Sequence, residues 1–188
     1  MLLRPSAARI IIRKPDDPDG AFTLTRVQDL IRADASIVGT DGPDSLTGTA
    51  GDDEILGLGG DDNVQGGLGL DSLYGGDGDD LLDGNEHADR MAGGAGNDIY
   101  RVDDYGDQVV EADGEGLDQV VARLSYALPQ GGVENLILPG AAATGQGNAL
   151  DNLLRGNAAD NLLQGLDGDD VVEGGGGRDR LHGGNGDD

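Results

Sequence analysis

Apolar side chains recur at every ninth position over the first half of the chain. They stand at Leu46, Ile55, Val64, Leu73, Leu82, Met91 and Tyr100. Glycine and aspartate predominate between them. Each unit of nine therefore predicts a six-residue, glycine-rich turn followed by a three-residue strand whose middle side chain points inward.

The period is continuous from Gly39 through seven nonapeptides, which read GTDGPDSLT, GTAGDDEIL, GLGGDDNVQ, GGLGLDSLY, GGDGDDLLD, GNEHADRMA and GGAGNDIYR. Position 1 is glycine and position 6 is aspartate in all seven units. Position 4 is glycine in all but one unit, where His87 replaces it. A repeat that keeps this phase predicts a solenoid of stacked units.

One unit cannot close a coil, because a closed coil needs at least two strands and two turns. We therefore expect each coil to contain two nonapeptides, with units n and n+2 stacked on one side. The position 6 residues then form two ladders, one of Asp44, Asp62, Asp80 and Asp98 and the other of Asp53, Asp71 and Asp89. Stacked strands lie about 4.7 to 4.9 Å apart. Because calcium–oxygen bonds are about 2.3 to 2.6 Å long, one calcium ion fits between successive turns.

These units resemble the RTX, or haemolysin-type, calcium-binding repeat GGxGxDxUx. The resemblance implies an all-β fold, a right-handed parallel β-roll, in a protein secreted by type I secretion. It also implies that Ca²⁺ is bound by the position 6 aspartates and by main-chain carbonyls near positions 2 and 4. The carbonyl candidates at position 4 are Gly42, Gly51, Gly60, Gly69, Gly78, Gly96 and Gly168.

A second block, residues 147–188, continues the repeat less regularly. Asn152 and Asn161 take position 6 in its first two units, and we expect their amides to replace the ion bridge with hydrogen bonds. Asp170, Asp179 and Asp188 restore the acidic ligand. Since Asp179 faces Asn161 across its ladder, only the pairing of Asp170 with Asp188 is complete.

The other two segments keep less of the pattern. Residues 102–146 are five nonapeptide lengths and contain the strand-like fragments Asp107-Gln-Val109 and Asp118-Gln-Val120, so we predict a degenerate β-solenoid continuation between the first block, 39–101, and the second. For residues 1–38 an N-terminal cap and a linker from another domain both stay open. Within them we predict a turn over Pro15–Gly20 and a short helix over Thr25–Asp34.

Charge restricts the partners. The chain has 37 acidic and 12 basic residues, a formal net charge of −25, and no cysteine. Nothing basic is dense enough to offset repulsion from phosphates, so calcium ions and not nucleic acids are the expected partners. The sequence has no N-terminal secretory signal and no apolar stretch of transmembrane length, so we expect no membrane span.

We expect no catalytic activity from these residues. His87 and His182 fall at a turn and at an outward strand position, and neither an HExxH nor a GxSxG motif is present. Adjacent acids such as Asp61 and Asp62 are explained as a calcium ligand beside a solvated neighbour. Because the repeat breaks off at Asp188, the chain is expected to be part of a longer protein. Two alternatives stay open: the C-terminal module of a secreted protease, lipase or alginate epimerase, with the missing domain covalently attached, and an extracellular adhesive module that binds polysaccharide.

Overall fold

A computed structural model of the chain describes residues 9–12 and 34–188. In this part of the chain all the regular secondary structure consists of β-strands, as the sequence predicts. The strands are β1 (Arg9–Ile12), β2 (Ala35–Val38), β3 (Ser45–Thr47), β4 (Glu54–Gly59), β5 (Asn63–Leu68), β6 (Ser72–Asp77), β7 (Leu81–Glu86), β8 (Arg90–Ala95), β9 (Ile99–Val102), β10 (Gln108–Val109), β11 (Gln119–Ala122), β12 (Tyr126–Ala127), β13 (Asn135–Ile137), β14 (Thr144–Gln146), β15 (Leu153–Arg155), β16 (Leu162–Asp167), β17 (Val171–Glu173) and β18 (Arg180–Asn185).

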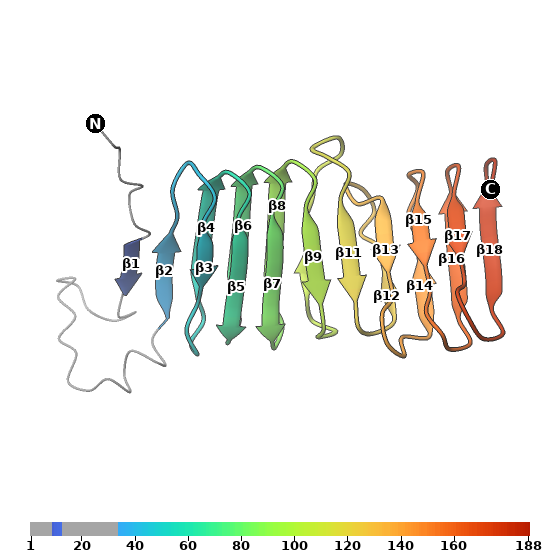
Figure 1. The fold of residues 1–188 in the computed structure, drawn as a ribbon, viewed down its shortest axis with the longest axis horizontal. Coiled ribbons are helices and arrows are strands. Elements are labelled where there is room, and N and C mark those ends of the chain that lie inside the picture. Colours follow the sequence, from blue (N-terminus) through green and yellow to red (C-terminus); the bar gives the residue numbers. More distant parts are fainter. Residues whose placement is uncertain (1–8, 13–33) are drawn as a thin grey trace.

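The strands alternate between two walls (Figure 1). One wall is a single sheet in the order β3, β5, β7, β9, β11, β13, β15 and β17. The other consists of two sheets, β1-β2-β4-β6-β8-β10 and β12-β14-β16-β18. From β2 onward consecutive strands lie in opposite walls, so two strands and two turns complete each coil of a parallel β-solenoid of about eight coils.

Stacking follows the n and n+2 pattern that the period predicts. Val64 on β5 pairs with Leu82 on β7, and Leu73 on β6 pairs with Met91 on β8. The step between equivalent residues is 18, two nonapeptides. Parallel pairing at this step places every position of one unit above the same position of the next coil.

The middle segment continues both walls with altered coil lengths. Tyr100 on β9 pairs with Val120 on β11, which in turn pairs with Leu136 on β13. The corresponding turn contacts step by 20 and then by 16 residues, in place of 18 twice. The long coil and the short coil compensate, so the 18-residue step resumes between Leu136 and Leu154. This is the degenerate β segment that the sequence predicts.

The core is a column of position 8 side chains between the walls. All seven of the first block are at most 2% exposed, and the column continues through Val120, Leu136, Leu154 and Leu163. Each coil buries its position 8 side chains in this column, which explains how a chain with 3% aromatic residues fills its interior.

Regular stacking begins before Gly39. Ile37 on β2 pairs with Ile55 on β4 and is buried, while β1 pairs with β2 in antiparallel fashion. The predicted turn over Pro15–Gly20 and, apart from Asp34, the predicted helix over Thr25–Asp34 lie outside the described residues. In the part of the chain that the structure describes, no helix is long and apolar enough to cross a membrane.

Candidate calcium-binding ladders

The position 6 aspartates stack along the two edges where the chain passes between walls. The backbone N–H of each one donates a hydrogen bond to Oδ1 of the aspartate one coil further on. Asp62 donates to Asp80 over 2.8 Å, and Asp80 donates to Asp98 over 2.7 Å. On the opposite edge Asp53 donates to Asp71 over 2.7 Å, and Asp71 donates to Asp89 over 2.8 Å. The two predicted ladders therefore exist as stacked rows.

The second carboxylate oxygen of most ladder residues is buried and has no hydrogen-bond partner. This holds for Oδ2 of Asp62, Asp71, Asp80, Asp89, Asp98, Asp118 and Asp170. Each of these residues is at most 3% exposed. A buried acceptor without a donor costs about 1 to 3 kcal/mol, and more when it is charged. A row of such oxygens one strand apart therefore fits a bound cation, and oxygen ligands favour calcium.

Position 1 glycine brings a carbonyl oxygen close to several of these carboxylates. A Cβ atom on Gly57 would lie 2.1 Å from Oδ2 of Asp62 and 2.5 Å from the carbonyl oxygen of Gly75. Two potential ligands thus converge on one point, which only glycine leaves free. Gly66 has the same surroundings. The sequence interpretation named carbonyls near positions 2 and 4 and did not identify those at position 1, although the invariance of this glycine was a signal.

Position 4 also requires an unusual backbone. Gly60, Gly69, Gly78 and Gly96 have φ between 94° and 136°. A Cβ on Gly78 would lie 2.6 Å from the backbone of Gly60 in the preceding coil. His87 adopts φ 86° at this position, a backbone conformation that residues other than glycine rarely adopt. Calcium ligation by the position 4 carbonyls stays a prediction.

Burial makes the ladder carboxylates difficult to ionise in the ion-free chain. It raises the pKa of Asp71 and Asp80 to about 6 and the pKa of Asp89 and Asp98 to about 7. Negative charge on the neighbouring ladder aspartates adds to the rise, and the backbone hydrogen bonds oppose it. The stacked row therefore favours either protons or a metal ion over bare carboxylates.

The first coil satisfies its carboxylates differently. Thr40, at position 2, donates to Oδ2 of Asp44 both from its backbone N–H over 2.6 Å and from its hydroxyl over 2.9 Å. The backbone N–H of Thr49 likewise donates to Oδ2 of Asp53. Threonine at position 2 thus supplies donors to the first aspartate of each ladder, where no preceding ladder aspartate could share a cation.

Asparagine has the corresponding role in the second block. Asn161 donates from its amide to the carbonyl of Ala142 over 2.8 Å, and its Oδ1 accepts the backbone N–H of Asn157. Asn152 donates its amide to Asn148 and accepts the backbone N–H of that residue. The prediction that amides form hydrogen bonds in these units is confirmed.

The acidic pairing predicted in this block is also present. The backbone N–H of Asp170 donates to Oδ1 of Asp188 over 3.1 Å, and that of Asn161 donates to Oδ1 of Asp179. Asp170 alone of these three aspartates retains a buried Oδ2 without a partner. Asp170, Asp179 and Asp188 remain candidate ligands, with the strongest demand for a cation at Asp170.

Both ladders extend into the middle segment. The backbone N–H of Asp89 donates to Asp107 over 3.1 Å, and that of Asp98 donates to Asp118 over 2.8 Å. Oδ2 of Asp107 accepts two backbone N–H groups, whereas Oδ2 of Asp118 has no partner. The sequence interpretation assigned these residues to strands and missed them as ladder members, although both stand in an Asp-Gln-Val fragment.

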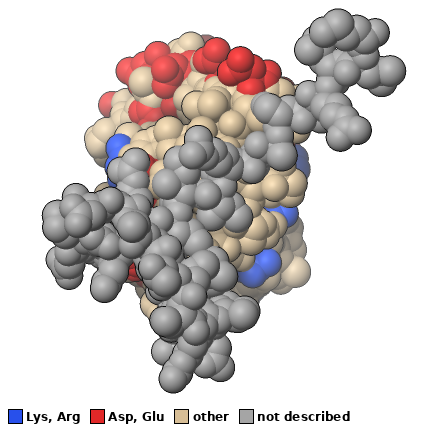
Figure 2. Space-filling model, turned by 90° about the vertical axis from the view of Figure 1, so that its left-hand side faces the viewer, with Lys and Arg blue, Asp and Glu red and all other residues tan. Residues whose placement is uncertain are grey.

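The position 5 carboxylates lie outside these ladders. Asp61 accepts the backbone N–H of Asp79 over 3.1 Å, and Asp79 accepts that of Asn97 over 2.7 Å, all at the exposed surface. Figure 2 shows acidic side chains gathered over the edge at the top of the molecule, where the turns after β4, β6 and β8 lie in Figure 1. The position 5 carboxylates are thus exposed to solvent, whereas most position 6 carboxylates are buried.

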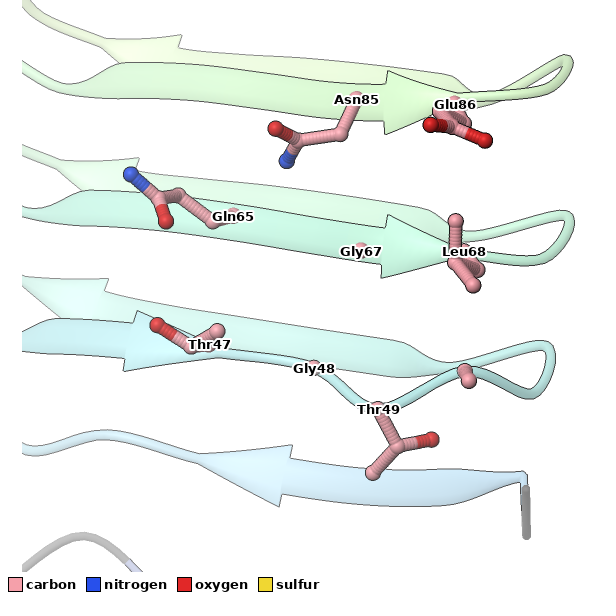
Figure 3. A pocket seen from close by; sticks show the side chains of 9 residues that line it. Thr47, Gly48, Thr49, Gln65, Gly67, Leu68, Asn85 and Glu86 are labelled. Atoms are coloured by element: carbon pink, nitrogen blue, oxygen red, sulfur yellow. The ribbon is translucent and has the colours of Figure 1, made fainter. Parts of the chain in front are cut away.

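One groove runs across β3, β5 and β7. Its lining includes Thr47, Gln65, Leu68, Asn85 and Glu86. Figure 3 shows the hydroxyl of Thr47 and the amides of Gln65 and Asn85 on three neighbouring strands. The groove therefore presents a row of neutral hydrogen-bonding groups.

Replacing Asp80 by alanine should remove two calcium ions, because Asp80 lies between Asp62 and Asp98 and would be shared by two sites. Asp79→Ala is the matched control, since it removes a neighbouring carboxylate that faces solvent. We expect native mass spectrometry at saturating calcium to show two ions fewer for Asp80→Ala and no change for Asp79→Ala. Equal ion counts for both variants would contradict the ladder as the binding site.

The ion-free chain should lose stability as pH rises from about 4 to about 7. The carboxyls of Asp71, Asp80, Asp89 and Asp98 have a folded pKa of about 6 to 7 and an unfolded pKa of about 3.9, so between these values the folded form binds more protons. In chelator, circular dichroism should report more β structure at pH 5 than at pH 8. With calcium the trend should reverse, because protons compete with the ion. Identical chelated spectra at the two pH values would refute this linkage.

A family model of the RTX calcium-binding nonapeptide repeat matches the chain in four overlapping copies, at residues 38–73, 65–100, 146–181 and 155–188. No curated protein matches the chain significantly. The matched stretches contain the two blocks of stacked coils and cover more than half of the sequence. Period, coil geometry and carboxylate ladders agree with this match, and the chain therefore belongs to the family of RTX calcium-binding nonapeptide repeat proteins.

Proposed function

We propose that the chain is a calcium-dependent folding module of a secreted protein, in which Ca²⁺ bound between successive turns stabilises the β-solenoid. The observation that carries this proposal is the row of buried Oδ2 atoms without hydrogen-bond partners. These carboxylates, with the carbonyl oxygens that approach them at position 1, would hold the ion.

The energies support ion-driven folding. Two carboxylates one strand apart repel by about 1 kcal/mol in water and by several times more at lower dielectric. A site held at about ten times its dissociation constant adds roughly 1.4 kcal/mol, so the five aspartate pairs predicted in the first block would add about 7 kcal/mol. The stability of a whole domain is about 5 to 15 kcal/mol. Binding at these sites can therefore decide whether the coils form.

Calcium dependence should be concentrated in the first block. Its coils contain most of the unpartnered Oδ2 atoms, whereas Asn152 and Asn161 form hydrogen bonds that need no ion. The second block keeps one such atom, on Asp170. The first block would thus respond to calcium, and the second would provide coils that depend on it less.

Export by type I secretion is the second part of the proposal and rests on the family. Calcium sites of extracellular modules bind at about 10⁻⁴ to 10⁻³ M, far above cytosolic calcium concentrations. A chain with net charge −25 whose fold requires such sites would be extended before export and would fold after it. The role is structural, not catalytic: His87 and His182 are both exposed, and neither faces a ladder carboxylate in hydrogen-bond contact.

Polysaccharide binding is a second candidate, favoured by the groove across β3, β5 and β7. Its row of hydroxyl and amide groups suits a neutral polysaccharide, since net charge −25 repels an anionic one. Affinity electrophoresis of the calcium-loaded chain in a neutral polysaccharide gel should show retardation that Gln65→Ala reduces. Gln164→Ala, at the same repeat position in the second block, is the matched control. Equal mobility of the chain with and without polysaccharide would exclude this role.

Calcium should convert the full chain from a largely disordered state to the β-solenoid. We expect circular dichroism in chelator to show little β signal, and millimolar calcium to restore it. An equal concentration of magnesium should not, because magnesium requires a small octahedral site and dehydrates reluctantly. A chain that keeps its full β signal in chelator at neutral pH would overturn the proposed function.

A further inference from the structure

Three carboxylates converge where the first ladder enters the middle segment. They belong to Asp98, before β9, to Glu111, after β10, and to Asp118, before β11, and one oxygen of each lies within 4.8 Å of the others. Glu111 lies outside the two nonapeptide blocks, and Asp118 follows Asp98 by 20 residues instead of 18. The cluster is therefore distinct from the repeated sites of the nonapeptides.

Two of these carboxylates are fully buried and have one oxygen without a hydrogen-bond partner. Asp98 and Asp118 are each 0% exposed. Their Oδ1 atoms accept the backbone N–H groups of Asp80 and Asp98, and both Oδ2 atoms are buried with no partner. The ion pairs between described residues are Arg101–Asp83, Arg155–Glu173 and Arg178–Asp160, and none of them neutralises the cluster.

Glu111 occupies the place that glycine holds in the repeat. Val109 on β10 pairs with Met91 on β8, so Glu111 comes into register with Gly93, a position 1 glycine. A Cβ on Gly93 would lie 2.0 Å from Oδ2 of Asp98 and 2.4 Å from the hydroxyl of Tyr100. One coil later the chain has a glutamate at this position, and its carboxylate extends toward the same group of atoms.

Tyr100 fixes the orientation of that glutamate. It is the aromatic member of the position 8 column, and its hydroxyl accepts the backbone N–H of Gly93 over 2.7 Å and donates to Oε2 of Glu111. The other oxygen, Oε1, accepts the N–H of Ala112 over 3.1 Å. Each carboxylate oxygen has a second lone pair, so both hydrogen bonds leave Glu111 able to bind a cation.

We propose that Asp98, Glu111 and Asp118 form an additional calcium site that ends the first ladder, with a glutamate from the connection replacing the glycine carbonyl of the regular repeat. The inference rests on the proposed calcium-binding function and adds a ligand set to it. Three carboxylates place more negative charge around one ion than the two of a repeat pair, which favours a hard divalent cation. In the next coil Glu134 stands in place of an aspartate, and its Oε2 accepts the backbone N–H of Asp118 over 2.8 Å.

The first test removes the glutamate charge and counts ions. Glu111→Gln keeps the size of the side chain and an oxygen for the Tyr100 hydroxyl, so the coil should still form. Asp113→Asn is the matched control, because Asp113 is an exposed carboxylate of the same connection. Native mass spectrometry of the full calcium-saturated chain should show one ion fewer for Glu111→Gln and an unchanged number for Asp113→Asn.

Equal, non-zero ion counts in all three proteins would overturn this site and leave the proposed function intact. An unmodified chain that binds no calcium would overturn both.

A second measurement does not depend on the folding of Glu111→Gln. Terbium replaces calcium at oxygen sites, and a nearby tyrosine ring sensitises its luminescence. Tyr100→Phe should lose most of the tyrosine-excited terbium emission of the full chain, whereas Tyr105→Phe, at an 83% exposed position, should retain it. Equal emission from the two variants would show that no ion binds beside the Tyr100 hydroxyl, and would overturn the proposal.

Discussion

The stacking of identical buried carboxylates is the constraint on which the rest of this structure depends. Parallel strand pairing at an 18-residue step places each aspartate directly over another, at the strand spacing of about 4.8 Å. The hydrogen bonds that form the walls therefore also force the charges together. Every ladder coil must neutralise its carboxylate with a proton, a metal ion or a hydrogen-bond donor, and the sequence can be understood as a choice among these three.

Hydrogen-bond donors satisfy the position 6 side chain where a ladder begins and where asparagine replaces aspartate. Thr40 supplies two of them to Asp44, backbone N–H groups supply them to Asp107, and amides take over at Asn152 and Asn161. In the coils between the threonines and the asparagines, Oδ2 of most ladder aspartates has no hydrogen-bond donor. The demand for a positive partner is thus concentrated in an internal stretch of coils, with one further unpartnered oxygen on Asp170, and the hydrogen-bonded coils depend less on a cation.

The regular nine-residue period explains which features of the structure the sequence could predict. A period of nine that needs two units per coil determines the apolar column, the n and n+2 stacking and the two ladders, and all three are present. The sequence could not predict the role of Asp118 or Glu111, because steps of 20 and 16 residues break the phase on which the prediction relied. Their place follows only from the register of β10 and β11.

Invariant glycine meets different constraints at positions 1 and 4 of the repeat. Its conformational freedom accounts for position 4 from Gly60 onward, where φ is positive, but Gly57 and Gly66 at position 1 have no positive φ. There the side chain is excluded by a carboxylate oxygen and a carbonyl from the next coil. Such a contact joins residues that are close only after the coil has closed, so composition and spacing do not reveal it.

Burial alone gives neighbouring aspartates different roles. Asp61 and Asp62 both take part in backbone hydrogen bonds between coils, but in opposite directions: Asp61 accepts from Asp79 in the following coil, whereas Asp80 in that coil accepts from Asp62. The outer row leaves its second oxygens to water, which screens the charge. The inner row is sealed between turns, where water cannot do so. We therefore assign the proposed cation to position 6, although position 5 often offers the same carboxylate one residue away, and the doubled acids of the repeat connect adjacent coils twice.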